Sequence, residues 1–356
     1  MTELEFHELR VTEVTRLTDD SVAITLDVPQ HLADEFAYLP GQHVTMRKVI
    51  DGQDIRRSYS ICANARNGKL RVAVKKLPGG AFSTYATTRL RADDTVEVMP
   101  PVGEFTIEVD PSLRRRAVAI AAGSGITPVM SLISTSLEAE PLADWTLIYG
   151  NRTANNIMFL EELEGLKDRY RNRLQLFHIL SREGSDVPLL SGRIDGQKIE
   201  TIHGLLGPDP VDGWYLCGPY DLVMTARHTL STLGVDASRV HDELFFAGPL
   251  DASKLPPEPP SGEGAVDLTV ILDGRAVTTR MTPETSILDA ALRVRSELPF
   301  SCKGGMCATC KGRIEEGEVS MDKNYALVDS EVDAGFVLTC QAHPRSDRVV
   351  VRYDHR

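Results

Sequence analysis

Four of the six cysteines in this 356-residue chain form one pattern near its C-terminal end. Cys302, Cys307 and Cys310 are spaced C-x4-C-x2-C, and Cys340 follows further along the chain. Plant-type [2Fe–2S] clusters are held by four thiolates with this spacing. The Gly-Gly pair inside the loop gives the backbone access to φ > 0 and brings amide N–H groups towards the sulfurs. The pattern therefore predicts that these four cysteines hold two irons.

Other uses of these cysteines compete with the iron–sulfur interpretation. A structural zinc site usually has two C-x2-C pairs, whereas this pattern contains one. Disulfides suit an exported chain, but the N-terminal segment is acidic and lacks the charged-then-apolar order of a signal peptide. No apolar run approaches the roughly 18 residues of a membrane-spanning helix. We therefore expect a cytoplasmic protein with no membrane partner.

A string of residue types that suit a cofactor lies in the N-terminal part of the chain. Arg57, Tyr59 and Ser60 offer a cation for a pyrophosphate, a flat face for a ring system and a hydroxyl for a ring heteroatom. Gly79 and Gly80 lead into a helical pattern, which is typical of an anion-binding helix start. Both features also have simpler interpretations, because exposed strands often carry such residues and a Gly-Gly turn can be a plain helix start.

A glycine-containing turn marks a second candidate site. Residues 123–128 follow an almost wholly apolar strand and open a helix whose first turn suits a proline. In a doubly wound sheet this is the position of a nucleotide pyrophosphate. The string is not the G-x-G-x-x-G fingerprint, so the prediction depends on position. The candidate residues are Gly123, Gly125, Ile126, Thr127 and Pro128.

Basic residues follow the next two predicted strands. Arg152 stands near the position where an NAD site would carry an acidic residue for the ribose hydroxyl. Ser181 and Arg182 end the strand after it. Two arginines and a serine suit a 2′-phosphate and favour NADPH over NADH, although surface arginines are often only solvated.

A further cysteine ends another predicted strand at the same edge of the sheet. Cys217, followed by Gly218 and Pro219, could lie beside a nicotinamide ring, or it could be a buried small residue. Cys62 has no partner motif and is expected in the core. The nine histidines show no metal-binding spacing.

The candidate sites divide among three predicted domains. Residues 1–110 contain short alternating runs and one helical pattern, which is typical of a small antiparallel β-barrel. In residues 111–246 strands alternate with helices, as in a doubly wound α/β sheet. The Pro-rich segment 247–264 is expected to be a semi-rigid linker. Residues 265–356 are expected to form a compact α+β domain that begins with a hairpin and a helix.

Charge limits the possible partners. The net charge of −12 argues against nucleic acid. Within the last domain, residues 313–335 hold seven acidic and two basic residues. Such a face could steer docking to a basic partner protein, or it could simply be solvated.

Taken together, these strings resemble the ferredoxin–NADP⁺ reductase superfamily fused to a plant-type ferredoxin. The resemblance covers essentially the whole chain and implies an FAD-binding β-barrel, an NADP-binding α/β domain and a β-grasp ferredoxin domain. Within the superfamily, the strings are most similar to the reductase subunits of bacterial phenylacetyl-CoA epoxidases. They are found at residues 121–128, 148–153, 192–196 and 302–311. The 3-ketosteroid 9α-hydroxylase reductases share the layout.

The resemblance implies a role for each candidate residue. Arg57 would hold the FAD pyrophosphate, Tyr59 would pack on the isoalloxazine, and Ser60 would hydrogen-bond near its N5. Cys217 would approach the nicotinamide, so Ser60 and Cys217 are the candidate catalytic residues. The arginines after the second and third strands of the α/β domain would bind the 2′-phosphate of NADPH. Further FAD contacts are implied for Ser58, Val74, Lys75, Gly80, Phe82 and Ser83.

Electron counting then gives the expected reaction. NADPH delivers two electrons together as hydride, whereas a [2Fe–2S] cluster accepts one, so a flavin must lie between them. We expect an NADPH-dependent reductase that passes single electrons to an oxygenase, namely the diiron subunit of phenylacetyl-CoA epoxidase. The same machinery could serve a 3-ketosteroid 9α-hydroxylase or another ring oxygenase. A third possibility is a redox sensor that binds flavin and cluster without turnover. Such a sensor would have no need of a nicotinamide-binding sheet.

Overall fold

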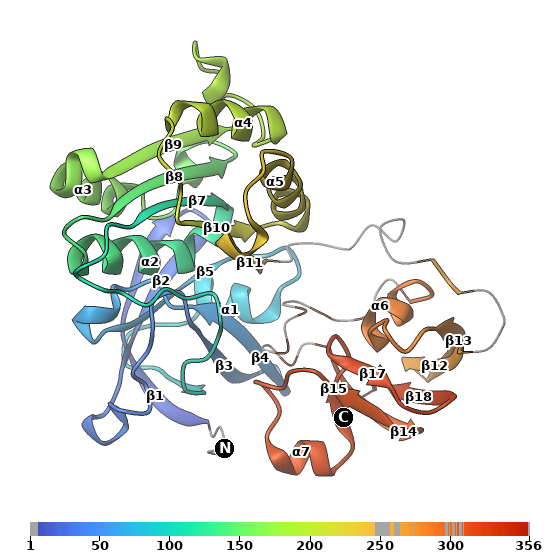
Figure 1. The fold of residues 1–356 in the computed structure, drawn as a ribbon. Helices are drawn as coiled ribbons and strands as arrows, with labels where there is room; N and C mark the ends of the chain where they lie inside the picture. Colours follow the sequence, from blue (N-terminus) through green and yellow to red (C-terminus); the bar gives the residue numbers. More distant parts are fainter. Residues whose placement is uncertain are drawn as a thin grey trace. The chain divides into compact units, whose positions relative to one another are not determined.

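A computed structural model shows the fold of the chain (Figure 1). It describes residues 6–245, 257–259, 264–272, 274–295, 298, 300, 303, 305, 308 and 310–354. One compact unit contains the second sheet and all of the first except Arg56–Ser58, and a second unit contains those three residues and the third sheet.

The first sheet has six strands in the order β4-β3-β6-β1-β2-β5. The strands are β1 (His7–Thr18), β2 (Ser21–Asp27), β3 (His43–Ile50), β4 (Gln53–Ser60), β5 (Leu70–Lys75) and β6 (Thr95–Val98), and the helix is α1 (Ala81–Thr88). Ile61, directly after β4, bridges Val72 of β5, so the two edge strands meet and the sheet closes. Alternating side chains such as Leu9 and Val11 fill the interior with Phe82 of α1.

The second sheet has five parallel strands in the order β11-β10-β7-β8-β9. The strands are β7 (Arg116–Ala122), β8 (Asp144–Asn151), β9 (Leu174–Leu180), β10 (Gly213–Gly218) and β11 (Val240–Leu244). The helices are α2 (Ile126–Ala139), α3 (Leu160–Tyr170), α4 (Gly196–Leu205) and α5 (Tyr220–Thr232).

Helices cover both faces of this sheet, as its apolar central strand requires. Ala119 and Ala121 of β7 pack in one core with α2 and α3. Val118 and Ile120, which point to the other face, pack in a second core with α4 and α5. Figure 1 shows the two helix layers on opposite sides of the strands.

The first two sheets pack against each other through α2. Ser131 Oγ donates to the carbonyl of Ala63 over 2.6 Å, and Thr135 Oγ1 accepts from the amide of Ala65 over 3.0 Å. Apolar residues from both sheets share one core. This contact holds the end of β4 close to the edge of the parallel sheet.

The third sheet is mixed, with the order β13-β12-β18-β14-β16. Its strands are β12 (Val266–Leu272), β13 (Arg275–Met281), β14 (Lys311–Glu316), β16 (Phe336–Leu338) and β18 (Arg348–Arg352). A separate pair joins β15 (Val319–Met321) to β17 (Ala342–Pro344), and the helices are α6 (Ile287–Leu292) and α7 (Asp329–Asp333). Ser286 caps α6 by accepting from the amide of Asp289.

Short 3-10 helices complete the described structure. They are η1 (Gln30–Leu32), η2 (Ala65–Asn67), η3 (Gly123–Gly125), η4 (Ala154–Asn156), η5 (Arg171–Arg173), η6 (Pro188–Leu190) and η7 (Ala237–Arg239). None of the helices in the described part of the chain is long and apolar enough to span a membrane.

The predicted fold classes are confirmed: an antiparallel barrel, a parallel α/β sheet and an α+β domain. The strands after the cysteine loop were not predicted, because most are very short and exist through pairing with one another and with β12. Most of the predicted linker, residues 247–264, lies outside the described residues.

Candidate functional site

Two buried polar side chains and a third that is largely covered meet where the barrel contacts the parallel sheet. Ser60 is the last residue of β4, His43 is the first of β3, and Glu243 lies on β11. Ser60 Oγ donates to Glu243 Oε2 over 3.3 Å. His43 Nδ1 lies 3.8 Å from the other carboxyl oxygen of Glu243. The carboxyl group therefore stands between a hydroxyl and an imidazole from the neighbouring domain.

Burial sets the protonation of this group. It raises the pKa of Glu243 to about 7, and the hydrogen bond from Ser60 opposes only part of that shift. It lowers the pKa of His43 to about 4, so the imidazole is neutral near pH 7. Neither ring nitrogen of His43 has a hydrogen-bond partner among the described residues. The site thus holds one carboxyl that exchanges a proton at neutral pH.

Cys217 lies beside this carboxyl. The register of β10 and β11 pairs Cys217 with Glu243. Burial raises the pKa of the Cys217 thiol well above its usual value, and the charges of Glu243 and Asp242 raise it further. The thiol therefore keeps its proton, which suits packing against a ring better than nucleophilic attack.

The predicted nucleotide turn has a backbone that only glycine fits at its closest points. Gly123 has φ +53° and starts η3, which runs into α2. A Cβ on Gly125 would lie 2.2 Å from the carbonyl oxygen of Cys217. Tyr149 Oη donates to the carbonyl of Gly123 over 2.9 Å. The turn is therefore held against the carboxyl ends of β8 and β10, which fits the nucleotide position of such sheets.

The predicted 2′-phosphate residues are brought together. The amide of Arg182 donates to the carbonyl of Arg152 over 2.8 Å, at the ends of β9 and β8. Both arginine side chains and Ser181 are exposed. Two exposed arginines whose backbones are hydrogen-bonded at the carboxyl edge offer donors for an anion.

The predicted flavin residues include apolar side chains in the barrel core and basic side chains that are only partly buried. Val74 and Phe82 are buried in the barrel core, and the Phe82 ring lies 5.5 Å from that of Tyr59. Lys75 Nζ lies 3.5 Å from Asp20. Arg57, in β4, is half-buried and donates from Nη1 to the carbonyl of Arg56 over 2.6 Å.

The turn before α1 takes the predicted form. Gly79 has φ +72°, and Gly80 caps the helix without a side-chain hydrogen bond. Ser83 Oγ donates to the carbonyl of Gly80 over 3.2 Å and accepts from the amide of Leu77 over 3.1 Å. The hydroxyl of Ser83 therefore stabilises the turn itself, whereas the first backbone amides of a helix are the groups that bind phosphate.

The cysteine loop shows the conformation expected of a tight loop around a cluster. Lys303, Gly305 and Ala308 have φ values of +50°, +81° and +48°, all in the left-handed region. Cys310 and Cys340 are 2% and 7% exposed and lie within an apolar core. Cys302 and Cys307 lie outside the described residues. Two buried thiols beside such a loop fit an iron–sulfur cluster.

Comparison with known families matches each of the three domains. Residues 8–107 match an oxidoreductase FAD-binding domain, and residues 119–228 match an oxidoreductase NAD-binding domain. Residues 270–345 match a 2Fe-2S iron-sulfur cluster binding domain. The chain is also 42% identical to one component of the 1,2-phenylacetyl-CoA epoxidase of Escherichia coli K12, over 98% of both chains.

The chain belongs to the ferredoxin–NADP⁺ reductase-like family whose members carry FAD-, NAD- and [2Fe–2S]-binding domains. This reductase is also 30% identical to the ferredoxin reductase component of 3-ketosteroid-9-alpha-monooxygenase from Rhodococcus rhodochrous, over 97% of this chain and 96% of the relative. Its fold is similar to that of phthalate dioxygenase reductase, with a TM-score of 0.56 over 98% of both chains and 24% identity. The cofactor domains and their order along the chain are thus those predicted.

The reductase is an electron-transfer component of a multicomponent oxygenase. Its FAD- and [2Fe–2S]-binding domains would supply the conversion of a two-electron hydride into single electrons. Where the barrel meets the parallel sheet, the chain itself presents the linked Ser60 hydroxyl and Glu243 carboxyl and the buried, protonated thiol of Cys217.

Sequence reasoning missed Glu243 and His43. Glu243 lies in the run His241–Leu244, which was predicted only as part of a strand. The signal that could have found it is a carboxylate on a parallel strand, where both faces are covered. The sequence does not reveal that β3 and β4 are the elements covering it.

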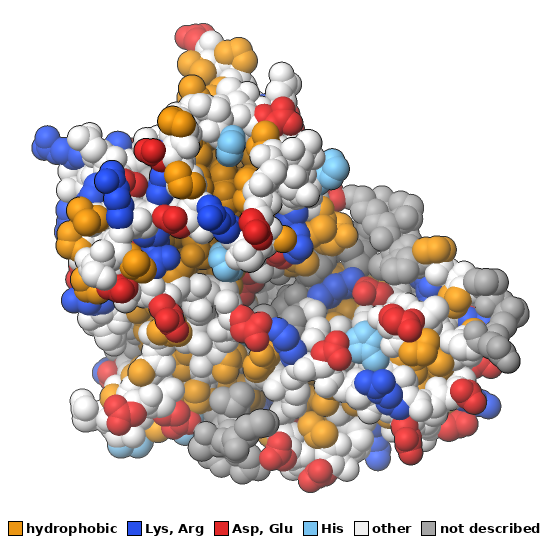
Figure 2. All heavy atoms as spheres, viewed as in Figure 1, with side chains coloured by type: hydrophobic (Ala, Val, Ile, Leu, Met, Phe, Trp, Pro, Cys, Tyr) orange, Lys and Arg blue, Asp and Glu red, His pale blue; other side chains and the backbone are white. Residues whose placement is uncertain are grey.

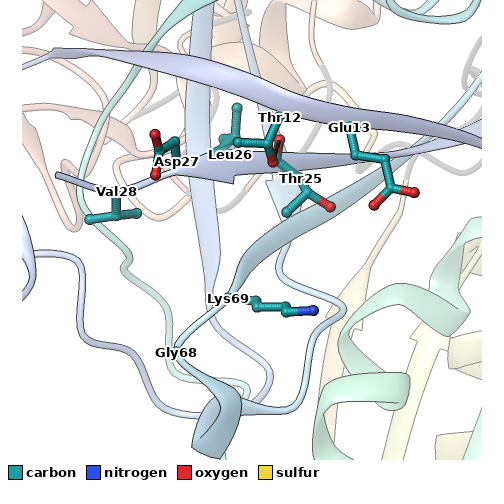
Figure 3. A pocket seen from close by; sticks show the side chains of 8 residues that line it. All are labelled: Thr12, Glu13, Thr25, Leu26, Asp27, Val28, Gly68 and Lys69. Atoms are coloured by element: carbon teal, nitrogen blue, oxygen red, sulfur yellow. Dashed lines mark hydrogen bonds between the residues drawn. The ribbon is translucent and has the colours of Figure 1, made fainter. Parts of the chain in front are cut away.

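A hollow on the barrel lies apart from the predicted site residues (Figure 3). Its lining comes from β1, β2 and the loop before β5, and consists of Thr12, Glu13, Thr25, Leu26, Asp27, Val28, Gly68 and Lys69. None of these residues was predicted to bind a cofactor. Its side chains mix two acids with one base and give no clear match to a flavin or a nucleotide.

Proposed function

We propose that the reductase takes hydride from NADPH and passes single electrons to the oxygenase that epoxidises phenylacetyl-CoA. The identity of 42% with the E. coli epoxidase component, over nearly the full length of both chains, supports this partner. The steroid-monooxygenase reductase shares the layout at 30% identity, so a steroid oxygenase is the second candidate.

Two arginines at the carboxyl edge of the parallel sheet support a preference for NADPH. Arg152 and Arg182 project from adjacent strand ends, and their backbones are joined by a hydrogen bond. Arginine binds phosphate through a planar fork of donors, so two of them together suit the dianionic 2′-phosphate. We propose that NADH, which lacks this phosphate, is the poorer donor.

Within the site we propose the following division of roles. Arg57 and Tyr59 bind FAD together with the start of α1, and Ser60 hydrogen-bonds to the flavin ring while remaining linked to Glu243. The turn from Gly123 to Gly125 binds the nucleotide pyrophosphate, with Cys217 under the nicotinamide. Cys302, Cys307, Cys310 and Cys340 hold the cluster.

The domain boundaries and cell compartment belong to the same proposal. We place the FAD domain at residues 1–110, the nucleotide domain at 111–246, the linker at 247–264 and the ferredoxin domain at 265–356. Since the four cluster ligands must stay reduced, we place the protein in the cytoplasm.

The acidic segment 313–335 is partly neutralised inside its own domain. Glu315 is paired with Arg352 and Glu316 with Arg348. Figure 2 shows acidic and basic side chains interspersed over the visible surface. We therefore expect docking to the oxygenase to depend on shape and short contacts as well as on charge, with a moderate decrease at high salt.

Reconstitution with purified partners tests the proposal. The reductase, with NADPH, should support epoxidation of phenylacetyl-CoA by the diiron oxygenase and should support a 3-ketosteroid oxygenase weakly or not at all. Reduction of cytochrome c serves as the control for a competent reductase. Full cytochrome c reduction with turnover only by the steroid oxygenase would overturn the partner assignment.

A further inference from the structure

A chain of buried hydroxyl groups connects the C-terminal strand to the cysteine loop. Cys310 directly precedes β14, and Thr339 lies between β16 and Cys340. Thr339 Oγ1 donates to the carbonyl of Cys310 over 2.8 Å, and its amide donates to the same oxygen over 3.3 Å. One residue therefore connects the segments that carry two of the four predicted ligands.

The second link is Tyr353, which follows β18. Tyr353 Oη donates to Thr339 Oγ1 over 2.8 Å, and both groups are buried. The backbone amide of Tyr353 donates to the carbonyl of Ile271 on β12 over 2.8 Å, which fixes the residue at the centre of the sheet. Burial raises the pKa of Tyr353 far above its usual value, so the phenol keeps its proton and acts as the donor.

We propose that Tyr353 is a positioning residue for the [2Fe–2S] cluster, acting through Thr339 on the Cys310 carbonyl and on the spacing between Cys310 and Cys340. The inference depends on the cluster and not on the identity of the oxygenase.

The direction of the hydrogen bonds explains how Tyr353 acts. A threonine hydroxyl has one proton and two lone pairs. When the phenol occupies a lone pair, the Thr339 proton is directed to Cys310. Without the phenol, a buried lone pair loses its partner and the hydroxyl is less well fixed. A buried chain of this kind is stronger than its separate parts, because each bond polarises the next.

Fixed ligand backbones matter for a centre that exchanges one electron. Hydrogen bonds and solvent access around the sulfurs set the reduction potential of such clusters. Movement of Cys310 relative to Cys340 would change both the ligand geometry and the access of water. We therefore expect Tyr353 to influence the spectrum, potential and retention of the cluster.

The experiment uses the full-length protein loaded with FAD and cluster. Tyr353→Phe and Thr339→Val remove the two hydroxyls with little change of shape, and Thr339→Ser keeps the second. We expect Tyr353→Phe and Thr339→Val to release iron to a chelator roughly three- to tenfold faster, as one lost buried hydrogen bond implies. They should also shift the reduction potential and the EPR spectrum of the reduced cluster. Thr339→Ser should stay close to the wild type.

The double variant provides a sharper test. If the two hydroxyls act in one chain, Tyr353→Phe combined with Thr339→Val should be no worse than Thr339→Val alone. Additive effects of the two substitutions would contradict a shared path.

Thr279→Val is the matched control. Thr279 is on β13, at the opposite edge of the sheet from β16, and its hydroxyl is buried without a partner among the described residues. The control should leave the cluster signals unchanged. The proposal is wrong if Tyr353→Phe lowers the melting temperature while the EPR spectrum, the reduction potential and the rate of iron release stay the same as in the wild type. NADPH-to-flavin reduction needs no oxygenase and should be normal in every variant, so failure of the partner assignment would be seen separately.

Discussion

The polar cluster of Ser60, His43 and Glu243 and the hydroxyl chain of Tyr353 and Thr339 differ in how their groups are paired. In the first, His43 has two buried ring nitrogens without hydrogen-bond partners among the described residues, and Glu243 is a largely covered carboxyl with a pKa of about 7. In the second, the hydroxyls of Tyr353 and Thr339 are both paired, in a chain that ends at Cys310. The first region keeps a proton exchangeable, and the second keeps its groups fixed.

This difference corresponds to the two kinds of chemistry. Hydride transfer to a flavin involves proton movement and an arriving ligand, so a titrating group and unsatisfied polar atoms have a use there. A one-electron centre has no need of a proton and benefits from ligands that do not move. The predictions below test this contrast, starting with the largest effect.

Cys340→Ser should remove the cluster signal completely. A serine oxygen is a poor substitute for one of four thiolates, and the site is buried. NADPH should still bleach the flavin, because hydride reaches the flavin before any electron reaches the cluster. Iron content, EPR and stopped-flow absorbance measure both effects. Loss of flavin reduction together with the cluster would contradict independent sites.

Arg152→Ala should raise the KM for NADPH roughly ten- to a hundredfold, as the loss of a charged hydrogen bond worth about 1.5–3 kcal/mol implies. The KM for NADH should change little. Arg169→Ala, an exposed arginine on α3, is the control. An equal rise in the KM for NADPH and for NADH would show that Arg152 does not bind the 2′-phosphate.

Glu243→Gln should change how stability depends on pH. Since the folded-state pKa of Glu243 is raised from 4.5 to about 7, its contribution to stability is fully present below about pH 4.5 and is lost as the pH rises through 7. Glutamine does not titrate, so it does not lose this contribution. The free energy of unfolding of the variant, relative to that of the wild type, should therefore increase by on the order of 2–3 kcal/mol between pH 4.5 and 8, since each pKa unit corresponds to about 1.4 kcal/mol.

Thermal or urea unfolding of the two proteins at several pH values measures this gain. A constant difference between them across the range would show that the pKa of Glu243 is the same in the folded and unfolded protein.

Thr279→Val should have the smallest effect. The Thr279 hydroxyl is buried and has no partner among the described residues, so a methyl group of similar size should be neutral or stabilise the protein by up to about 1 kcal/mol. Urea unfolding measures the change. A loss of stability instead of a gain would show that the hydroxyl has a partner, so that this buried group of the cluster domain would also be paired.

The sequence predicted those parts of the molecule whose signals are local. Strands such as Leu70–Lys75 and Leu174–Leu180 can be recognised from the sequence, because their apolar patterns and turns are complete within a few residues. The cysteine spacing and the nucleotide turn were recognisable for the same reason. Gly125 was predicted for its position, and the structure adds that its backbone contacts Cys217.

The parts that depend on long-range packing were not predictable. Glu243 is a site residue only because β3 and β4 cover it, and these strands are far away in the sequence. Phe336–Leu338 is a three-residue strand that exists through pairing with β14. Likewise, the link from Tyr353 to Cys310 requires the order of strands in the third sheet.

Anaerobic titration of the purified holoprotein with NADPH, followed by absorbance and low-temperature EPR, tests the central claim most directly. We predict that the flavin absorbance bleaches and that the signal of a reduced [2Fe–2S] cluster then grows, with one electron stored at the cluster. Bleaching of the flavin without any cluster signal, or zinc in place of iron at the cysteines, would contradict the account.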